Sequence, residues 1–291
     1  INLSSEIISI GDYAFSCCTK LNTKIPPNIR NIGKYAFENC LWIKEVNLKA
    51  TNLYIGEGIF KNCQRIEKVS MPENLLIIKK RTFMDCKSLK HIILSSKLNK
   101  IEESAFQGCK SLEYFKIPDS VTLIENNAFR NSGLKSIILP QNLSVLKKQL
   151  FYNCRKLEQI IFPKNLTIIE DRTFQNCYKL TSIVFPNTLA YLGKAVCQKC
   201  ILLNTVTFNS KLTKISNAAF KKCFSLQQIN FYNGLKIVGK EAFEDCISIL
   251  NVKLPNSVIK IQKNAFAYCS KLIEFYFPNN LQEIGPNAFK N

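Results

Sequence analysis

Cysteines are the residues in this sequence with the greatest capacity for chemistry, and there are thirteen of them. Cysteines at regular spacing can ligate metals, form disulfides or lie buried as free thiols. Eleven recur at one position of a regular repeat: Cys18, Cys40, Cys63, Cys86, Cys109, Cys154, Cys177, Cys200, Cys223, Cys246 and Cys269. Ser132 takes that position in its own unit, and serine can neither form a disulfide nor act as a thiolate ligand. The pattern therefore favours buried free thiols.

Motifs for metal binding, cofactor binding or catalysis are scarce. Cys197-Gln-Lys-Cys200 has the C-x-x-C spacing, but no second pair accompanies it, and His91 is the only histidine. The sequence contains no Gly-x-Ser-x-Gly, Gly-x-Gly-x-x-Gly or Walker-type glycine loop and no paired acidic motif. We therefore predict no catalytic residue, no metal site and no cofactor, and a protein that is not an enzyme.

The spacing that positions the cysteines is a repeat that runs through the whole chain. A phenylalanine recurs at every twenty-third position, with two steps that are one position shorter: Phe15, Phe37, Phe60, Phe83, Phe106, Phe129, Phe151, Phe174, Phe220, Phe243, Phe266 and Phe289. Cys197 stands at the one missing step, so thirteen units can be counted. Deletions of a single residue at Thr23-Lys24-Ile25 and Asn131-Ser132-Gly133 cause the short steps. A fixed period of roughly 23 residues per coil is typical of a solenoid.

Each unit predicts one short strand followed by a turn. In residues 180–185 apolar and variable residues alternate, and a proline then ends the strand in seven units. A strand that recurs once per coil must stack parallel on its copies, so we expect one parallel concave sheet of about twelve strands. The rest of the unit is too short for a regular helix, so we expect a short strand or a single 3₁₀ turn on the convex side.

The repeat predicts one domain over residues 1–291, although the length alone would suggest two. Both ends fall within a coil and lack polar capping coils, which suggests a piece of a longer protein. No apolar run approaches the roughly 18 residues that a membrane-spanning helix needs. The first thirty residues show no targeting pattern. We therefore expect no membrane span in this segment.

The repeat frame Leu-x-x-Ile-x-Leu-Pro-x-x-Leu-x-x-Ile-x-x-x-Ala-Phe-x-x-Cys resembles the BspA-like leucine-rich repeats, and the resemblance covers residues 3–291. Ala-Phe-x-x-Cys is complete at 36–40, 105–109, 219–223, 242–246 and 265–269. The resemblance implies a curved right-handed leucine-rich repeat solenoid. Members are often cell-surface proteins of bacteria and parasitic protists that attach to host or matrix proteins, and they share no active site.

Outward-pointing strand positions are the sites that this fold leaves free for a partner. In the middle coils these positions become apolar, and such an exposed patch often marks a contact site. We call this set the concave patch: His91, Ile93, Tyr114, Lys116, Ile138, Gln159, Ile161 and Val184. The alternative explanation is β-propensity, because branched residues suit strand surfaces whatever they touch.

The net charge of +19 favours acidic partners. Part of it lies three positions before the phenylalanine, in a basic row that Glu57, Glu103 and Asp171 interrupt: Lys34, Lys80, Lys148, Lys194, Lys240 and Lys263. The alternative is a solvated convex face without a function. The basic positions lack interleaved aromatics, which disfavours nucleic acid as a partner.

Two functions remain open. The resemblance favours a non-enzymatic adhesion module, at the cell surface or extracellular, that binds a protein through its concave sheet. The free thiols and the positive charge suit an intracellular structural scaffold docked on an acidic assembly, such as a microtubule or a nucleoprotein particle. The sequence names neither the partner nor the compartment.

Overall fold

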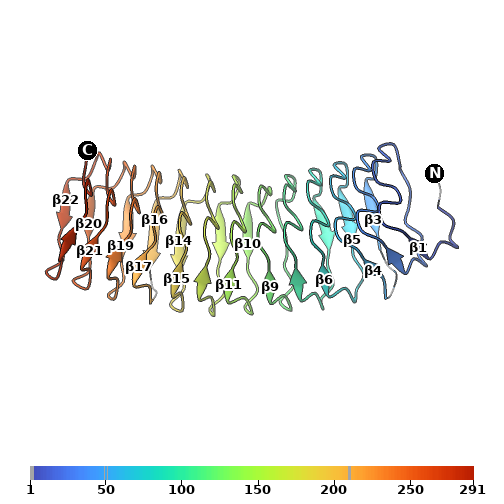
Figure 1. The fold of residues 1–291 in the computed structure, drawn as a ribbon, viewed down its shortest axis with the longest axis horizontal. Helices are drawn as coiled ribbons and strands as arrows, with labels where there is room; N and C mark the ends of the chain where they lie inside the picture. The colour runs from blue at the N-terminus through green and yellow to red at the C-terminus, as the bar shows by residue number, and fades with distance from the viewer. Residues whose placement is uncertain (1–2, 49, 51, 209–210) are drawn as a thin grey trace. The chain divides into compact units, whose positions relative to one another are not determined.

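The computed structural model describes residues 3–48, 50, 52–208 and 211–291. They form two compact units, Ile1–Asn142 and Leu143–Asn291. Each unit is a parallel-strand β-solenoid, which confirms the predicted fold class. Most side chains that meet in neighbouring coils are 23 residues apart in both units, as Lys61 and Glu38 are in the first and Lys147 and Glu170 in the second. Figure 1 shows two short strands in most coils. The prediction that residues 1–291 form one domain stays a prediction.

The first set of strands, which we call the long-strand row, contains the strands predicted from the alternating pattern. In the first unit it comprises β3 (Glu45–Asn47), β5 (Lys68–Ser70), β7 (His91–Ile93) and β10 (Ser136–Ile138). In the second unit it comprises β12 (Gln159–Ile161), β14 (Ser182–Phe185), β16 (Thr205–Phe208), β18 (Gln228–Asn230), β20 (Asn251–Lys253) and β22 (Glu274–Tyr276). Neighbours pair in parallel through equivalent positions of successive units, as Glu45 does with Lys68 and Ser182 with Thr205. The sequence period therefore sets the register directly.

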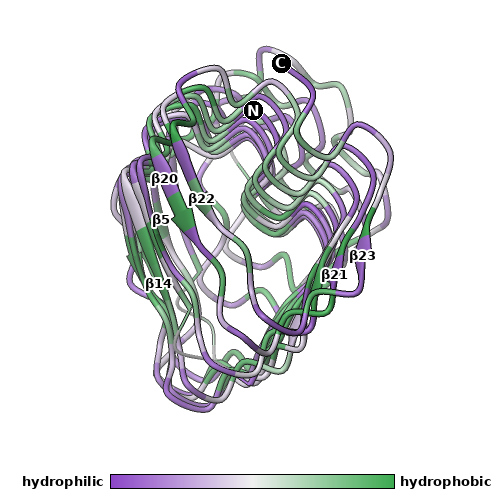
Figure 2. Cartoon of the chain, turned by 90° about the vertical axis from the view of Figure 1, so that its left-hand side faces the viewer, coloured by the Kyte–Doolittle hydropathy of each residue, from purple (hydrophilic) through white to green (hydrophobic). Residues whose placement is uncertain are grey.

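A second set, which we call the short-strand row, matches the short strand that we expected in the remainder of each unit. In the first unit it comprises β1 (Ser9–Ile10), β2 (Asn31–Ile32), β4 (Tyr54–Ile55), β6 (Ile77–Ile78), β8 (Lys100–Ile101) and β9 (Leu123–Ile124). In the second it comprises β11 (Val145–Leu146), β13 (Ile168–Ile169), β15 (Tyr191–Leu192), β17 (Lys214–Ile215), β19 (Ile237–Val238), β21 (Lys260–Ile261) and β23 (Glu283–Ile284). In Figure 2, β20 and β22 lie across the interior from β21 and β23. Two residues are too few to show a period in sequence, so the bounds of these strands come only from the stacking of the coils.

The segment around each phenylalanine forms non-helical turns. No residue that the structure describes is in an α- or 3₁₀-helix, so the 3₁₀ turn that we expected as one possibility is absent from the described residues. Residues two positions before and after the phenylalanine are left-handed, as Tyr35 (φ 53°) and Asn39 (φ 60°) are around Phe37. The amides of Tyr35, Phe37 and Asn39 donate to carbonyls of the next coil at 2.8, 3.0 and 2.9 Å. Alternating left-handed residues break any helical turn but keep this third ladder of hydrogen bonds between coils.

The core of each unit is a stack of phenylalanine rings. In the first unit Phe83, Phe106 and Phe129 are fully buried, and their ring centroids lie 5.5 and 5.6 Å apart. In the second unit the position of Cys197 interrupts this stack, and a second stack of Phe162, Phe185, Phe208 and Phe231 runs past it with spacings of 6.0, 5.4 and 6.0 Å. The largest fully buried side chains are almost all phenylalanines of these stacks.

The cysteine ladder has a structural role beyond its size. All thirteen cysteines are free thiols, and ten of the eleven at the ladder position are buried. Buried ladder thiols donate to the backbone carbonyl at the phenylalanine position of the preceding coil. Cys63 donates to the Phe37 carbonyl at 2.9 Å and Cys200 to the Phe174 carbonyl at 3.1 Å. The predicted burial of free thiols is confirmed at these ten positions. Through their hydrogen bonds, buried ladder thiols also link coils to the preceding ones.

Candidate partner-binding surface

All eight residues of the predicted concave patch are exposed along the face of the long-strand row. His91, Ile93, Tyr114, Lys116 and Ile138 belong to the first unit; Gln159, Ile161 and Val184 belong to the second. The pleat explains this exposure, because successive side chains of a strand point to opposite faces. Ile137 is buried in the core, at 2% exposure, whereas the neighbouring Ile138 is 65% exposed.

The structure brings three of these residues together in the first unit. Tyr114, Lys116 and Ile138 line an open hollow of about 320 Å³, which we call the strand hollow. Its remaining lining residues are Phe115, Ile117, Asp119, Ser136, Ile137 and Leu139. Tyr114 is 69% exposed, so the hollow has an accessible aromatic wall and an apolar floor. His91 and Ile93 lie on β7 of the same unit and do not line it.

The hollow lies where the repeat loses a single residue. Tyr114 and Ser136 form only an isolated parallel bridge, in place of a paired strand. In the shortened turn the amide of Gly133 donates to the Cys109 carbonyl at 3.0 Å. A Cβ added at Gly133 would clash with the Lys110 carbonyl oxygen, so only glycine allows this close approach. The deletion therefore weakens the ladder locally and leaves the outward side chains apart.

The lining of the strand hollow includes one basic and one acidic side chain, Lys116 and Asp119. The Lys135 ammonium lies 5.9 Å from the centroid of the Tyr114 ring and 2.7 Å from the Glu113 carboxylate. Lys116 is exposed and makes no ion pair within the part of the chain that the structure describes. An apolar wall beside an unpaired ammonium can bind an apolar side chain that is followed by an acidic one.

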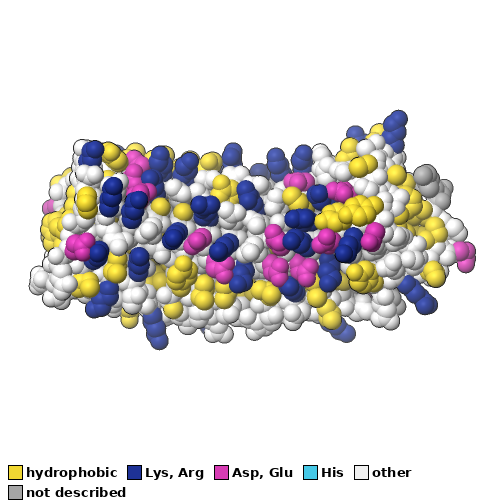
Figure 3. Space-filling model, in the orientation of Figure 1, with side chains coloured by type: hydrophobic (Ala, Val, Ile, Leu, Met, Phe, Trp, Pro, Cys, Tyr) yellow, Lys and Arg dark blue, Asp and Glu magenta, His cyan; other side chains and the backbone are white. Residues whose placement is uncertain are grey.

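The basic row is also at the surface. Lys34, Lys148, Lys194, Lys240 and Lys263 are exposed, and Lys80 is half-buried. Lys80 lies 2.7 Å from the Glu103 carboxylate, and this hydrogen bond raises the pKa of the ammonium group. Figure 3 shows Lys and Arg side chains scattered over one face of each unit, with Asp and Glu side chains between them. The row is therefore a set of separate sites and not a continuous basic surface.

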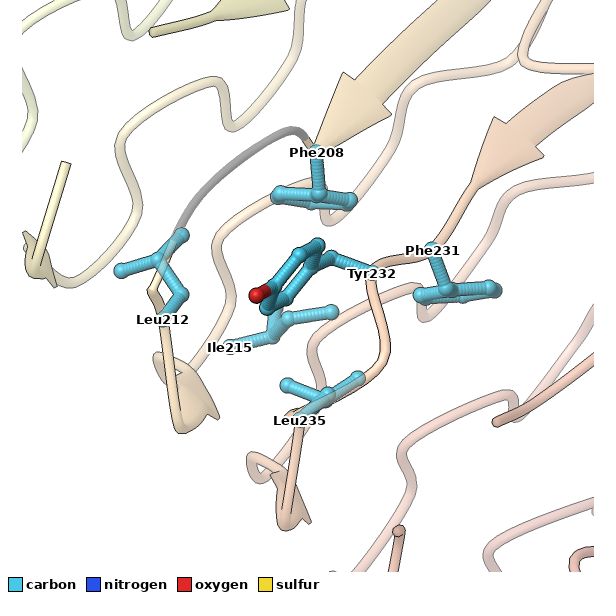
Figure 4. A pocket seen from close by; sticks show the side chains of 6 residues that line it. All are labelled: Phe208, Leu212, Ile215, Phe231, Tyr232 and Leu235. Atoms are coloured by element: carbon cyan, nitrogen blue, oxygen red, sulfur yellow. The ribbon is translucent and has the colours of Figure 1, made fainter. Parts of the chain in front are cut away.

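A small apolar gap and the buried thiols of the described chain offer no binding site. A gap of about 10 Å³ in the second unit is lined by five apolar side chains and Tyr232, and it holds no more than a water molecule (Figure 4). Among the described residues, no group of three or more His, Cys, Asp or Glu side chains is arranged to hold a metal. Burial raises the pKa of the Cys40 and Cys269 thiols to about 12, which keeps them protonated and unreactive.

Comparison with known proteins agrees with this architecture. A family model described as BspA type leucine rich repeat region, in six copies, matches residues 1–113, 99–225 and 191–291. A leucine-rich repeat protein from Bacteroides ovatus is 28% identical, with a TM-score of 0.70, over 100% of this chain and 84% of that one. A leucine-rich cell surface protein from Faecalibacterium prausnitzii is 21% identical, with a TM-score of 0.53, over 98% and 90%. A leucine-rich repeat protein from Eubacterium ventriosum is 19% identical, with a TM-score of 0.56, over 99% and 81%.

No sequence among curated proteins matches this chain. The described residues include no helix that is long and apolar enough to span a membrane. Sequence reasoning named three residues that line the strand hollow, Tyr114, Lys116 and Ile138, but not the hollow itself. The signal that could have located the hollow is the deletion at Asn131-Ser132-Gly133, which lies in the sequence between Tyr114 and its bridge partner Ser136.

Proposed function

Because this chain belongs to the BspA-type leucine-rich repeat family, we propose that it is a protein-binding module whose partner contacts the long-strand row. Members of the leucine-rich repeat family are typically non-enzymatic repeat proteins, and their stacked coils offer an extended surface for contact. The observation that carries the proposal is the strand hollow, where exposed Tyr114 and Ile138 flank an apolar floor.

The chemistry of the strand hollow defines the expected contact. A tyrosine wall and an apolar floor are the features of binding hot spots, where one large side chain is buried by its partner. Lys116 adds a positive charge beside that contact. We therefore expect the partner to present an extended segment with a bulky apolar residue next to an acidic one.

Selection from a displayed peptide library tests this function without knowledge of the partner. The double variant Tyr114→Ala/Ile138→Asp serves for counter-selection, because both side chains are exposed and their loss should leave the fold intact. Tyr191→Ala is the matched control, since this tyrosine is 48% exposed on the short-strand row. We expect peptides that bind the wild type and Tyr191→Ala but lose about tenfold or more in affinity for the double variant. Peptides that bind all three proteins equally would refute a site at the strand hollow.

The setting that we propose is the cell surface, where the module acts in adhesion. The resemblance supports it, and so does the fold shared with a protein named as a leucine-rich cell surface protein. Antibody labelling of intact cells, before and after permeabilisation, tests the setting. Labelling of intact cells is expected, and labelling only after permeabilisation would contradict it.

A second candidate is an intracellular scaffold that docks on an acidic assembly. Two observations favour it: the cysteines are free thiols, and the net charge is +19. Under this alternative a crosslinked partner is acidic and is released by salt, because exposed charges are screened within about 10 Å at 0.1 M ionic strength. A partner that is retained at high salt and crosslinks near the long-strand row would favour the adhesion module.

A further inference from the structure

A second hollow lies in the second unit, at the corner between the short-strand row and the turns. We call it the basic hollow; its volume is about 390 Å³. It is lined by Asn217, Lys240, Lys260, Gln262, Lys263, Glu283, Gly285 and Pro286. Three lysines face one glutamate, so the hollow carries a net positive charge.

The basic hollow lacks a carboxylate that accepts a hydrogen bond from a backbone amide of the basic row. In four other coils the amide at the basic-row position donates to a carboxylate from an adjacent coil. Lys34 donates to Asp12 at 2.7 Å and Lys194 to Asp171 at 2.8 Å, in each case from the preceding coil. The amide of Lys80 donates to Glu102 in the next coil at 3.0 Å. Lys148 is bonded in the same way, with Glu170 as the acceptor at 3.1 Å.

At the basic hollow no such carboxylate is supplied. The Lys240 amide donates to the neutral amide oxygens of Asn217 and Gln262, at 3.2 and 3.1 Å. Among the six lysines of the basic row, only Lys263 has an amide without a hydrogen bond to a described residue, a state that the amides of Glu57, Asp171 and Asn217 share at the equivalent position of their coils. The two capping positions of Lys263 are occupied by Lys240 and Gly285, neither of which offers a side-chain acceptor.

Gly285 also leaves the amide accessible. A Cβ added at Gly285 would have the Lys263 backbone nitrogen as its nearest neighbour, at 2.6 Å. Gly285, which lines the hollow, therefore lies beside this unbonded N–H group without a side chain that could cover it. Among the lysines, Lys260 is held by Glu283 at 2.7 Å and Lys240 by Glu241 at 3.3 Å, whereas Lys263 has no ion pair with any described residue.

We propose that the basic hollow binds the side-chain carboxylate of an acidic polypeptide segment. The incoming carboxylate takes the place that Asp12, Glu102, Glu170 and Asp171 take in their own coils, and it accepts from the Lys263 amide. The ammonium groups of Lys240 and Lys263 add charge-assisted contacts at the rim. The acidic partner fits the net charge of +19.

This inference rests on the proposed function only in taking a polypeptide as the ligand, because the strand hollow lies in the other unit and is not required. The probe is a fluorescently labelled hexaglutamate peptide, with hexaglutamine as the uncharged control. The variant Lys240→Gln/Lys263→Gln removes the rim charges. Its matched control is Lys148→Gln/Lys194→Gln, which changes two lysines of the same row whose amides are already bonded to Glu170 and Asp171.

Fluorescence anisotropy at low salt gives the affinities. We expect hexaglutamate to bind, hexaglutamine not to bind, and the Lys240/Lys263 variant to lose on the order of tenfold in affinity while the control pair loses less than about threefold. Glu283→Gln should tighten binding severalfold, because it releases Lys260. Equal losses in the two double variants would overturn the site in favour of general charge attraction, and so would an absence of hexaglutamate binding.

Tyr114→Ala/Ile138→Asp separates this inference from the proposed function. Hexaglutamate binding should be unchanged in that variant, since its substitutions lie at the strand hollow. If the library peptides fail to bind but hexaglutamate still distinguishes the two lysine pairs, the proposed function is wrong and the basic hollow stands. If the library peptides bind at the strand hollow but hexaglutamate does not distinguish the two lysine pairs, the site at the basic hollow is wrong and the proposed function stands.

Discussion

The cysteine ladder makes the fold sensitive to alkaline pH. Burial raises the pKa of nine thiols above the ordinary value of 9.0: Cys40, Cys63, Cys86, Cys109, Cys177, Cys197, Cys223, Cys246 and Cys269. A thiol whose pKa is higher in the folded chain than in the unfolded chain makes its full contribution to stability at pH values below the unfolded-chain pKa. The free energy of unfolding then falls as the pH rises from the unfolded towards the folded pKa.

The size of the effect follows from the pKa window. At about pH 10 each such thiol has lost roughly 1.4 kcal/mol of its contribution, because the unfolded chain ionises and the folded one does not. The losses add, since every thiol stays neutral in the folded state and neutral thiols do not repel one another. Nine thiols then cost on the order of 10 kcal/mol, which is comparable to the whole free energy of unfolding of a typical domain.

Urea titrations of the reduced protein at a series of pH values, followed by circular dichroism, measure this effect. We expect the unfolding midpoint to fall steeply above about pH 9, with the fold lost near about pH 10 to 11. The variant Cys63→Ser/Cys86→Ser/Cys109→Ser removes three of the nine thiols, and Ser132 shows that a buried serine fits the position. The slope of the free energy against pH should fall by about one third in this variant. An unchanged slope would show that lysine or tyrosine ionisation controls alkaline unfolding, and would refute the reasoning.

Three further substitutions test the packing of the coils. Phe106→Ala should lower the free energy of unfolding by about 3–5 kcal/mol, because the ring is fully buried between two stacked neighbours; a smaller loss in urea titration would mean that the coils collapse around the gap. Gly133→Ala should destabilise the first unit by more than about 1 kcal/mol through its contact with the Lys110 carbonyl, and a melting temperature equal to that of the wild type would contradict the close approach. Glu38→Gln should cost less than about 1 kcal/mol although it breaks a 2.8 Å ion pair with Lys61, since the lysine is partly exposed; a large loss of stability would show that this pair is coupled to the core.

The candidate surface could be predicted in part. Period two along a strand places alternate residues on opposite faces, so the exposure of Ile93, Ile138 and Val184 followed from the sequence alone. The strand hollow could not be predicted from the sequence in this way. It depends on how the shortened turn at Gly133 draws one coil against the next and reduces pairing at Tyr114 to a single bridge. A deletion of a single residue in a repeat shows where a distortion lies, but its shape is fixed by contacts between coils.

The basic row could also be predicted only in part. The spacing of its six lysines is readable from the sequence, and all six are wholly or partly at the surface. Which of them has a bonded amide is not readable, because the capping carboxylate comes either from the preceding coil, as Asp171 does for Lys194, or from the next coil, as Glu170 does for Lys148. Only the folded geometry identifies these two capping positions; once they are known, the sequence shows that neither of them offers Lys263 a side-chain acceptor.

The sequence by itself determined the period, the parallel register, the stacked phenylalanines and the buried cysteines, because each coil must place the same apolar residues above those of its neighbour. The tertiary structure alone decided the bounds of the short-strand row, the left-handed turns around each phenylalanine and the two hollows. These features arise from hydrogen bonds and close contacts between residues of successive coils, and a local pattern of hydrophobicity carries no information about which of those partners meet.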